Sequence, residues 1–199
     1  MQFGTVPCRL AVGSMVAIRA RDRDRLAPTG KASLKGLLST PDLIFGYMPR
    51  VDYGRMQPFL NKYIHRARTV ALPNTQGIRH MFTMLIKGRV DWTVFDPTAT
   101  AYLVNQMGIG DQIAIVPALE AEPEFTPGYM AGPRDAWGRH MLYRIDEILA
   151  REIVSGRLHD LLATWIPQDL RPDFDRHYKQ LMQKPAQAFL DANANEPAE

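Results

Sequence analysis

Two junctions between a predicted strand and the helix that follows it hold the side chains best suited to binding a small polar molecule. Asp96 comes directly after the hydrophobic run 90–95 and directly before Pro97, and proline favours the first turn of a helix. At this position the carboxylate either caps the helix or receives the ammonium group of a ligand. The two roles can coexist.

The other junction is the run Gly46-Tyr47-Met48-Pro49-Arg50-Val51-Asp52-Tyr53-Gly54. Arg50 brings a guanidinium group, Tyr53 an aromatic ring and Gly54 room for close backbone approach. An anionic ligand group would suit the positive start of the next helix. The alternative is an ordinary loop in which Asp52 caps that helix. Asn74, at a third junction, has the same two interpretations, and the cap is favoured.

Catalytic and metal-binding patterns are missing from the sequence. There is no Gly-x-Ser-x-Gly and no phosphate-binding glycine motif, and the single cysteine, Cys8, excludes an internal disulfide and a cysteine-rich metal site. The five histidines stand singly and lack the i, i+4 pairing of a helical zinc site; they are His65, His80, His140, His159 and His177. We therefore expect no enzyme, no cofactor and no metal.

Composition is that of a soluble globular protein, with 46% hydrophobic and 23% charged residues in 199. The net charge of +3 comes from scattered arginines. The densest basic run, 19–25, is interrupted by Asp22 and Asp24, so a solvated loop is expected and no nucleic-acid partner. No run approaches the roughly 20 apolar residues of a membrane span, and the first residues lack a signal-peptide pattern.

Strand-like and helix-like segments alternate, which predicts an α/β fold with a largely parallel sheet flanked by helices. Strands are predicted at 14–20, 43–46, 69–72, 90–95, 113–116 and 128–131. Helices are predicted at 33–38, 56–64, 75–88, 97–107, 137–149 and 158–165. The acidic, proline-containing segment 120–127 is interpreted as a connector between two units.

Four segments, in order, resemble the type II extracytoplasmic solute-binding proteins of the polar amino acid-binding family. The run Gly88-Arg89-Val90-Asp91 through Leu103 resembles the family's "GRVDAVVxDxxxAxYL" segment. The runs 43–54, 3–7 with 14–19, and 128–131 with 156–166 are similar to its ligand loop, its "FSxPY…LVVR" entry and its "GIAV…GxLxxIxxKW" ending. The match covers about residues 3 to 167.

The resemblance implies a periplasmic binding protein-like type II fold with lobe 2 at 8–126, a C-terminal part of lobe 1 at 127–182 and a disordered tail at 183–199. It implies a periplasmic solute-binding module that recognises a small polar ligand, without chemistry, for an ABC transporter permease. Asp96 would meet the ligand's ammonium group, and the loop from Arg50 to Gly54 its carboxylate. That loop departs from the family's "GTT" form, so the substrate class stays open.

The resemblance also implies that the first half of lobe 1 has no counterpart here, because the family's lobe 1 begins well before the position of Phe3. The remaining part of lobe 1 would then leave apolar surface uncovered, which predicts weak stability or self-association. The alternatives are a ligand-sensing domain of a signalling protein, an enzyme of the same fold and a truncated, non-functional remnant.

Overall fold

The computed structural model describes residues 1–73, 77–121 and 124–194. The chain forms two compact units, which are described separately here. The sheet unit is Val12–Glu124, and the ribbon unit is Met1–Ala11 with Phe125–Glu199. The expected lobe boundaries, 8–126 and 127–182, differ from these because residues 2–12 form a long strand, most of which pairs with Phe125–Gly132 in the ribbon unit.

A five-stranded mixed sheet in the order β4-β3-β5-β2-β6 forms the centre of the sheet unit. Its strands are β2 (Met15–Arg19), β3 (Ile44–Tyr47), β4 (Arg68–Ala71), β5 (Trp92–Phe95) and β6 (Ile113–Val116). Strand β3 pairs in parallel with β4 and β5, whereas β2 runs antiparallel to both β5 and β6. Every predicted strand of this unit is present, and four of these strands point the same way.

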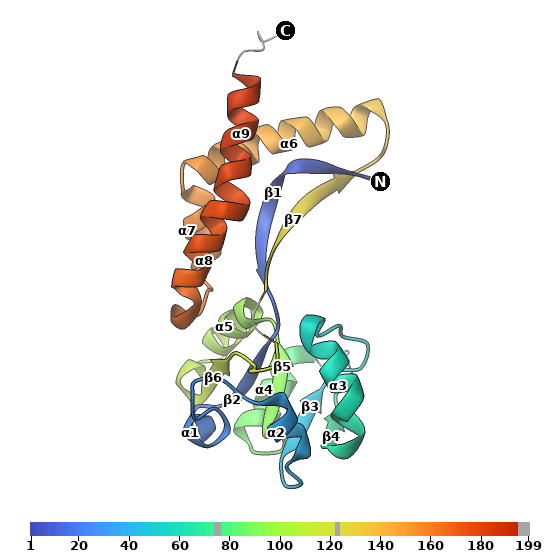
Figure 1. The fold of residues 1–199 in the computed structure, drawn as a ribbon, viewed down its shortest axis with the longest axis vertical. Coiled ribbons are helices and arrows are strands. Elements are labelled where there is room, and N and C mark those ends of the chain that lie inside the picture. The colour runs from blue at the N-terminus through green and yellow to red at the C-terminus, as the bar shows by residue number, and fades with distance from the viewer. Residues whose placement is uncertain (74–76, 122–123, 195–199) are drawn as a thin grey trace. The chain divides into compact units, whose positions relative to one another are not determined.

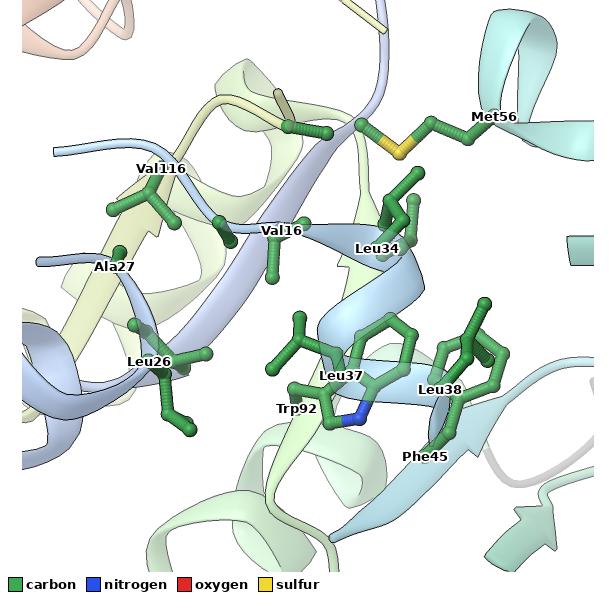
Figure 2. Close-up of a cluster of buried hydrophobic side chains, with 14 of the residues drawn as sticks. Val16, Leu26, Ala27, Leu34, Leu37, Leu38, Phe45, Met56, Trp92 and Val116 are labelled. Atoms are coloured by element: carbon green, nitrogen blue, oxygen red, sulfur yellow. The ribbon is translucent and has the colours of Figure 1, made fainter. Parts of the chain in front are cut away.

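Helices cover both faces of this sheet (Figure 1). They are α1 (Arg23–Leu26), α2 (Leu34–Ser39), α3 (Gln57–Tyr63), α4 (Gly77–Ile86) and α5 (Pro97–Gln106). Side chains alternate along each strand, so Val16 and Ile18 belong to one apolar cluster and Ala17 to the other. In the first cluster the ring of Trp92 stacks on Phe45 at 4.1 Å between centroids, beside Leu37 and Leu38 of α2 (Figure 2).

A buried arginine forms hydrogen bonds and ion pairs at the edge of the sheet where β3, β5 and β6 begin. Arg19, at the end of β2, is 8% exposed. Its guanidinium bonds Asp22 and Asp91, each at 2.6 Å, and donates to the carbonyls of Leu85 and Val90. The other oxygen of Asp91 accepts from the backbone N–H of Ile44 at 2.8 Å. The segment 19–25 is therefore not simply a solvated loop, because its first arginine links two strands and a turn.

The ribbon unit consists of two paired strands and a set of helices. Strands β1 (Gln2–Val12) and β7 (Phe125–Gly132) lie side by side and run in opposite directions (Figure 1). The helices are α6 (Ala136–Val154), α7 (Arg157–Ala163), α8 (Arg171–Tyr178) and α9 (Lys184–Asn193), with a π-helical turn, Lys179–Gln183, between α8 and α9. Predicted helices 137–149 and 158–165 correspond to α6 and α7.

The prediction of a disordered tail from 183 is wrong over Lys184–Asn193, which form helix α9. The polar composition of this segment gave no sign of its apolar face. Ala186 is fully buried, and the centroid of the Phe189 ring lies 5.7 Å from that of Tyr143 on α6. Pro185 offers no N–H to the carbonyl four residues earlier, and the π-helical turn lies at this point in the chain.

Candidate functional site

Strands β3, β4 and β5 end at the same edge of the sheet unit, and the predicted site residues that the structure describes follow β3 and β5. Tyr47, the last residue of β3, lies opposite Ala71 of β4. Gly46 lies opposite Thr93 of β5, so the loop after β3 and Asp96 after β5 leave the sheet on neighbouring strands. Neighbouring strands lie about 4.8 Å apart. The fold therefore brings the two predicted junctions together.

Asp96 caps helix α5 and keeps one carboxylate oxygen available. Its Oδ1 accepts from the backbone N–H of Ala99 at 2.8 Å and from the hydroxyl of Thr98 at 2.5 Å. Within the described residues no group bonds to Oδ2, and the side chain is half-buried. The cap consumes one oxygen, so the geometry permits both roles that the sequence suggested.

Arg50 is the described non-glycine residue with a left-handed backbone, at φ 67°. Such a conformation costs roughly 1 kcal/mol or more for a side chain with a Cβ, and the surrounding fold must impose it. The side chain is exposed, and its guanidinium pairs with no group in the described part of the chain. Arg50 thus belongs to the loop after β3, at the edge where the neighbouring strand β5 leads into Asp96.

The rest of this loop is occupied with its own hydrogen bonds. The phenol oxygen of Tyr53 accepts from the N–H of Met48 at 2.8 Å and donates to the carbonyl of Met48 at 3.3 Å. Tyr53 is 4% exposed, and burial raises the pKa of its phenol more than the bond with Met48 lowers it. Tyr53 therefore holds the loop closed rather than offering its hydroxyl to a ligand.

Two further loop amides are also taken. Asp52 Oδ1 accepts from the N–H of Gly54 at 2.9 Å, and Gln57 Oε1 accepts from the N–H of Tyr53 at 3.1 Å. The chain then forms a 3-10 turn, Gly54–Met56, before the seven-residue helix α3. The loop therefore does not present a row of free amides to an anion, and the positive charge within 46–54 is the guanidinium of Arg50.

Some site features have no clear signal in the sequence. Arg55 forms an ion pair with Glu124 at 2.7 Å, across 69 residues of sequence. Thr98, whose hydroxyl bonds Asp96, lies within the predicted first turn of a helix and could have been found there. Asn74 lies outside the described residues.

The described residues include neither a metal-binding cluster nor a helix that could span a membrane. Among them, no group of three or more His, Cys, Asp and Glu side chains is placed to hold a metal ion. No helix in the same ranges is long and apolar enough to cross a membrane.

Comparison with known proteins shows the fold. No protein-family model matches the chain, and no curated protein matches it. Among solved structures, an amino-acid ABC transporter extracellular-binding protein from Bacillus subtilis matches with a TM-score of 0.61 at 15% identity, over 84% of this chain and 65% of that one.

Two other structures with the same fold hold ligands. An amino acid ABC transporter substrate-binding protein from Streptococcus pneumoniae, bound to L-arginine, matches with a TM-score of 0.51 at 20% identity, over 81% of this chain and 59% of that one. A binding component of an ABC transporter from Wolinella succinogenes, complexed with lysine, matches with a TM-score of 0.52 at 17% identity, over 83% and 62%. The chain thus has a type II periplasmic binding protein-like α/β fold and spans about three fifths of the length of these structures.

Proposed function

We propose that this chain is the solute-binding module of an ABC-type uptake system and that it holds a small amino acid-like or anionic molecule without chemical change. The observation that carries the proposal is that Asp96 Oδ2 and the guanidinium of Arg50, which follow neighbouring strands at one sheet edge, have no bonding partner among the described residues. These groups suit a ligand with an ammonium and a carboxylate group. The structures of similar fold bound to L-arginine and lysine support this ligand class.

The same proposal includes a permease partner and a site of action outside the cytoplasm. Its support is the fold shared with ABC transporter binding proteins of three bacteria. The ligand edge belongs to the sheet unit, whose core is covered on both faces. We therefore expect the sheet unit to supply the recognition chemistry.

A thermal-shift screen with amino acids, small peptides and organic acids tests ligand binding. A ligand at about 100 times its dissociation constant stabilises the fold by roughly 2.7 kcal/mol. Asp96→Asn should abolish this shift while leaving the ligand-free Tm near the original value, because asparagine also caps helices well. Asp96→Ala should lose the shift and also about 1 kcal/mol of stability.

Matched arginine variants complete the test. Arg50→Gln should weaken the shift, whereas Arg68→Gln, at an exposed position on β4, should leave it unchanged. An Asp96→Asn variant that is stabilised as strongly as the original chain would refute the assignment of Asp96. A screen without any hit would refute the binding function for this chain.

A second proposal concerns a partner: we infer that two copies associate through helix α6. Trp137, Met141 and Ile148 are 63%, 39% and 57% exposed, and their spacing of four and seven residues places them on one face. Arg139, His140 and Arg144 lie in the first half of α6, and Asp146, Glu147, Arg151 and Glu152 make the second half net acidic. An antiparallel pair of α6 helices would bring opposite charges together around the apolar stripe.

Light scattering with size exclusion, over a range of concentrations, tests this association. The mass should rise toward that of a dimer, and the double variant Trp137→Gln, Ile148→Gln should remain monomeric. Leu119→Gln, at a 54% exposed position in the sheet unit, should leave the dimer intact. A monomer at every concentration that binds no hydrophobic dye would contradict the proposal.

A further inference from the structure

A hollow of about 260 Å³ lies at the edge of the sheet unit where β2 ends and β6 begins. Because β3 and β5 begin at this edge and end at the other, the hollow lies across the sheet from Asp96. The 3-10 turns Ala20–Asp22 and Gly110–Gln112 contact each other beside it. Its lining consists of Arg19, Ala20, Arg21, Ile86, Asp111 and Gln112.

The wall formed by Arg19 is rigid and has no spare charge. Both carboxylates that bond its guanidinium lie at 2.6 Å, and two backbone carbonyls take further N–H groups. Burial by itself would lower the pKa of Arg19, but the bonds with Asp91 and Asp22 outweigh it and raise the pKa. This wall is therefore a fixed surface, and it does not compete for a ligand's carboxylate.

The two charges that remain are opposite in sign and come from different turns. Arg21 and Asp111 are exposed, and neither forms an ion pair or hydrogen bond through its side chain within the described residues. They line the same hollow without bonding each other. Ile86 and Ala20 add apolar surface, and the amide of Gln112 adds a donor and an acceptor.

We propose that this hollow is a second binding site, for a small dipolar molecule whose anionic group meets Arg21 and whose ammonium group meets Asp111. The volume is below the roughly 300 to 1,000 Å³ of pockets for drug-sized ligands, which suits a smaller metabolite. Both charges are exposed, so binding is weak and sensitive to salt. The site is independent of Asp96 and of the function proposed above.

Amide chemical shifts measured by NMR test this site on the full chain. The probes are glycine, β-alanine and 4-aminobutyrate, which share the two charged groups at increasing separation. At least one should shift the amides of Arg21, Ile86, Asp111 and Gln112 in a saturable manner. Acetate and methylammonium carry one charge each, so each lacks one charged hydrogen bond. Their binding should be weaker by a factor of about ten or more.

Two variants at the hollow, two at exposed residues elsewhere and one at Asp96 separate the possible outcomes. Arg21→Gln and Asp111→Asn should each weaken binding about tenfold, whereas Arg68→Gln and Asp24→Asn should not change it. The shifts should persist in Asp96→Asn, even if the function proposed for that edge fails. Absence of saturable shifts around the hollow, or Arg21→Gln and Asp111→Asn variants that bind as tightly as the original chain, would overturn the proposal.

Discussion

The sheet unit encloses its apolar side chains between helices on both faces, whereas the ribbon unit leaves many of its own in solvent. Among the exposed large hydrophobic residues that the structure describes, the sheet unit contributes Tyr102 and Leu119. The others belong to the ribbon unit: Met1, Phe3, Tyr129, Met130, Trp137, Met141, Tyr143, Ile148 and Leu161. A two-stranded ribbon has too little sheet to cover helices of this length.

The pairing of buried charged side chains also differs between the two units, and it is again more complete in the sheet unit. Arg19 in the sheet unit has four partners for its guanidinium. Asp146 in the ribbon unit is 3% exposed, and only its Oδ2 is bonded, by the N–H and hydroxyl of Thr5. Its Oδ1 is buried without a hydrogen-bond partner among the described residues. The buried guanidinium of the sheet unit is thus fully paired, whereas one oxygen of the buried carboxylate in the ribbon unit has no partner among the described residues.

Removing the charge of Arg19 should give the largest effect. Arg19→Met leaves Asp91 without its cation, Asp22 with only the exposed Arg25, and two carbonyls without a donor, which should cost about 3–5 kcal/mol of unfolding free energy. Urea unfolding followed by the fluorescence of Trp92, with Trp137 and Trp165 replaced by phenylalanine, reports this loss in the sheet unit.

The control for this variant is Arg25→Met, at a side chain that is 57% exposed but pairs with the same Asp22. It should cost less than about 0.5 kcal/mol. Equal costs for the two variants would show that the buried network contributes no more than a surface pair.

Gly4→Ala should give an intermediate effect in the ribbon unit. A Cβ at this position on β1 would lie 2.5 Å from Asp146 Oδ1. Because Oδ2 of the same carboxylate is held by Thr5, the group cannot move without losing those bonds. The expected cost is about 1–3 kcal/mol, measured by urea unfolding with Trp165 fluorescence.

Gly110→Ala is the matched control, since a Cβ there meets nothing within 4 Å. It should leave the unfolding free energy unchanged or raise it by up to about 1 kcal/mol. A Gly4→Ala chain as stable as the original would mean that Asp146 can shift freely, contrary to the packing of β1 on α6.

The local signals in the sequence were sufficient for most of the sheet unit. Runs of apolar residues predicted β2 and β5, and the proline after Asp96 predicted the start of α5. The reversed direction of β2 was not predictable, because periodicity reports burial and not strand direction. Strand β1 was missed since its cysteine, proline and glycine are poor strand signals, and its pairing with β7 spans more than a hundred residues.

The sequence predicted where the candidate site lies better than it predicted which of its polar groups are available to a ligand. Asp96 was identified from its place between a strand and a helix, and the structure adds that one of its oxygens is free. Asp52 and Tyr53 were equally visible, but only the folded loop shows that both bond their own backbone. The pairs Arg55 with Glu124 and Arg19 with Asp91 depend on long-range contacts that no local pattern encodes.

The smallest effect is expected from pH, at the contact between α7 and α8. His159 Nε2 lies 2.9 Å from Asp175 Oδ1 and Nδ1 lies 3.2 Å from Asp160 Oδ1, beside the rings of Phe174 and Tyr178. Burial by itself would lower the pKa of His159, but the bonds with Asp175 and Asp160 outweigh it and raise the pKa above 6.5.

Because the folded pKa of His159 exceeds the unfolded one, its contribution is complete below about pH 6.5 and is lost as the pH rises through the folded value. The contribution is less than about 1 kcal/mol, since the imidazole is partly exposed. The ribbon unit should therefore have a slightly lower Tm at pH 8 than at pH 6 in His159 chains. His159→Gln and Asp175→Asn should flatten this difference, whereas His140→Gln, on the exposed surface of α6, should retain it. If His159→Gln keeps the same pH dependence, the imidazole does not stabilise the α7–α8 contact, and the packing of Phe174 alone must hold the two helices together.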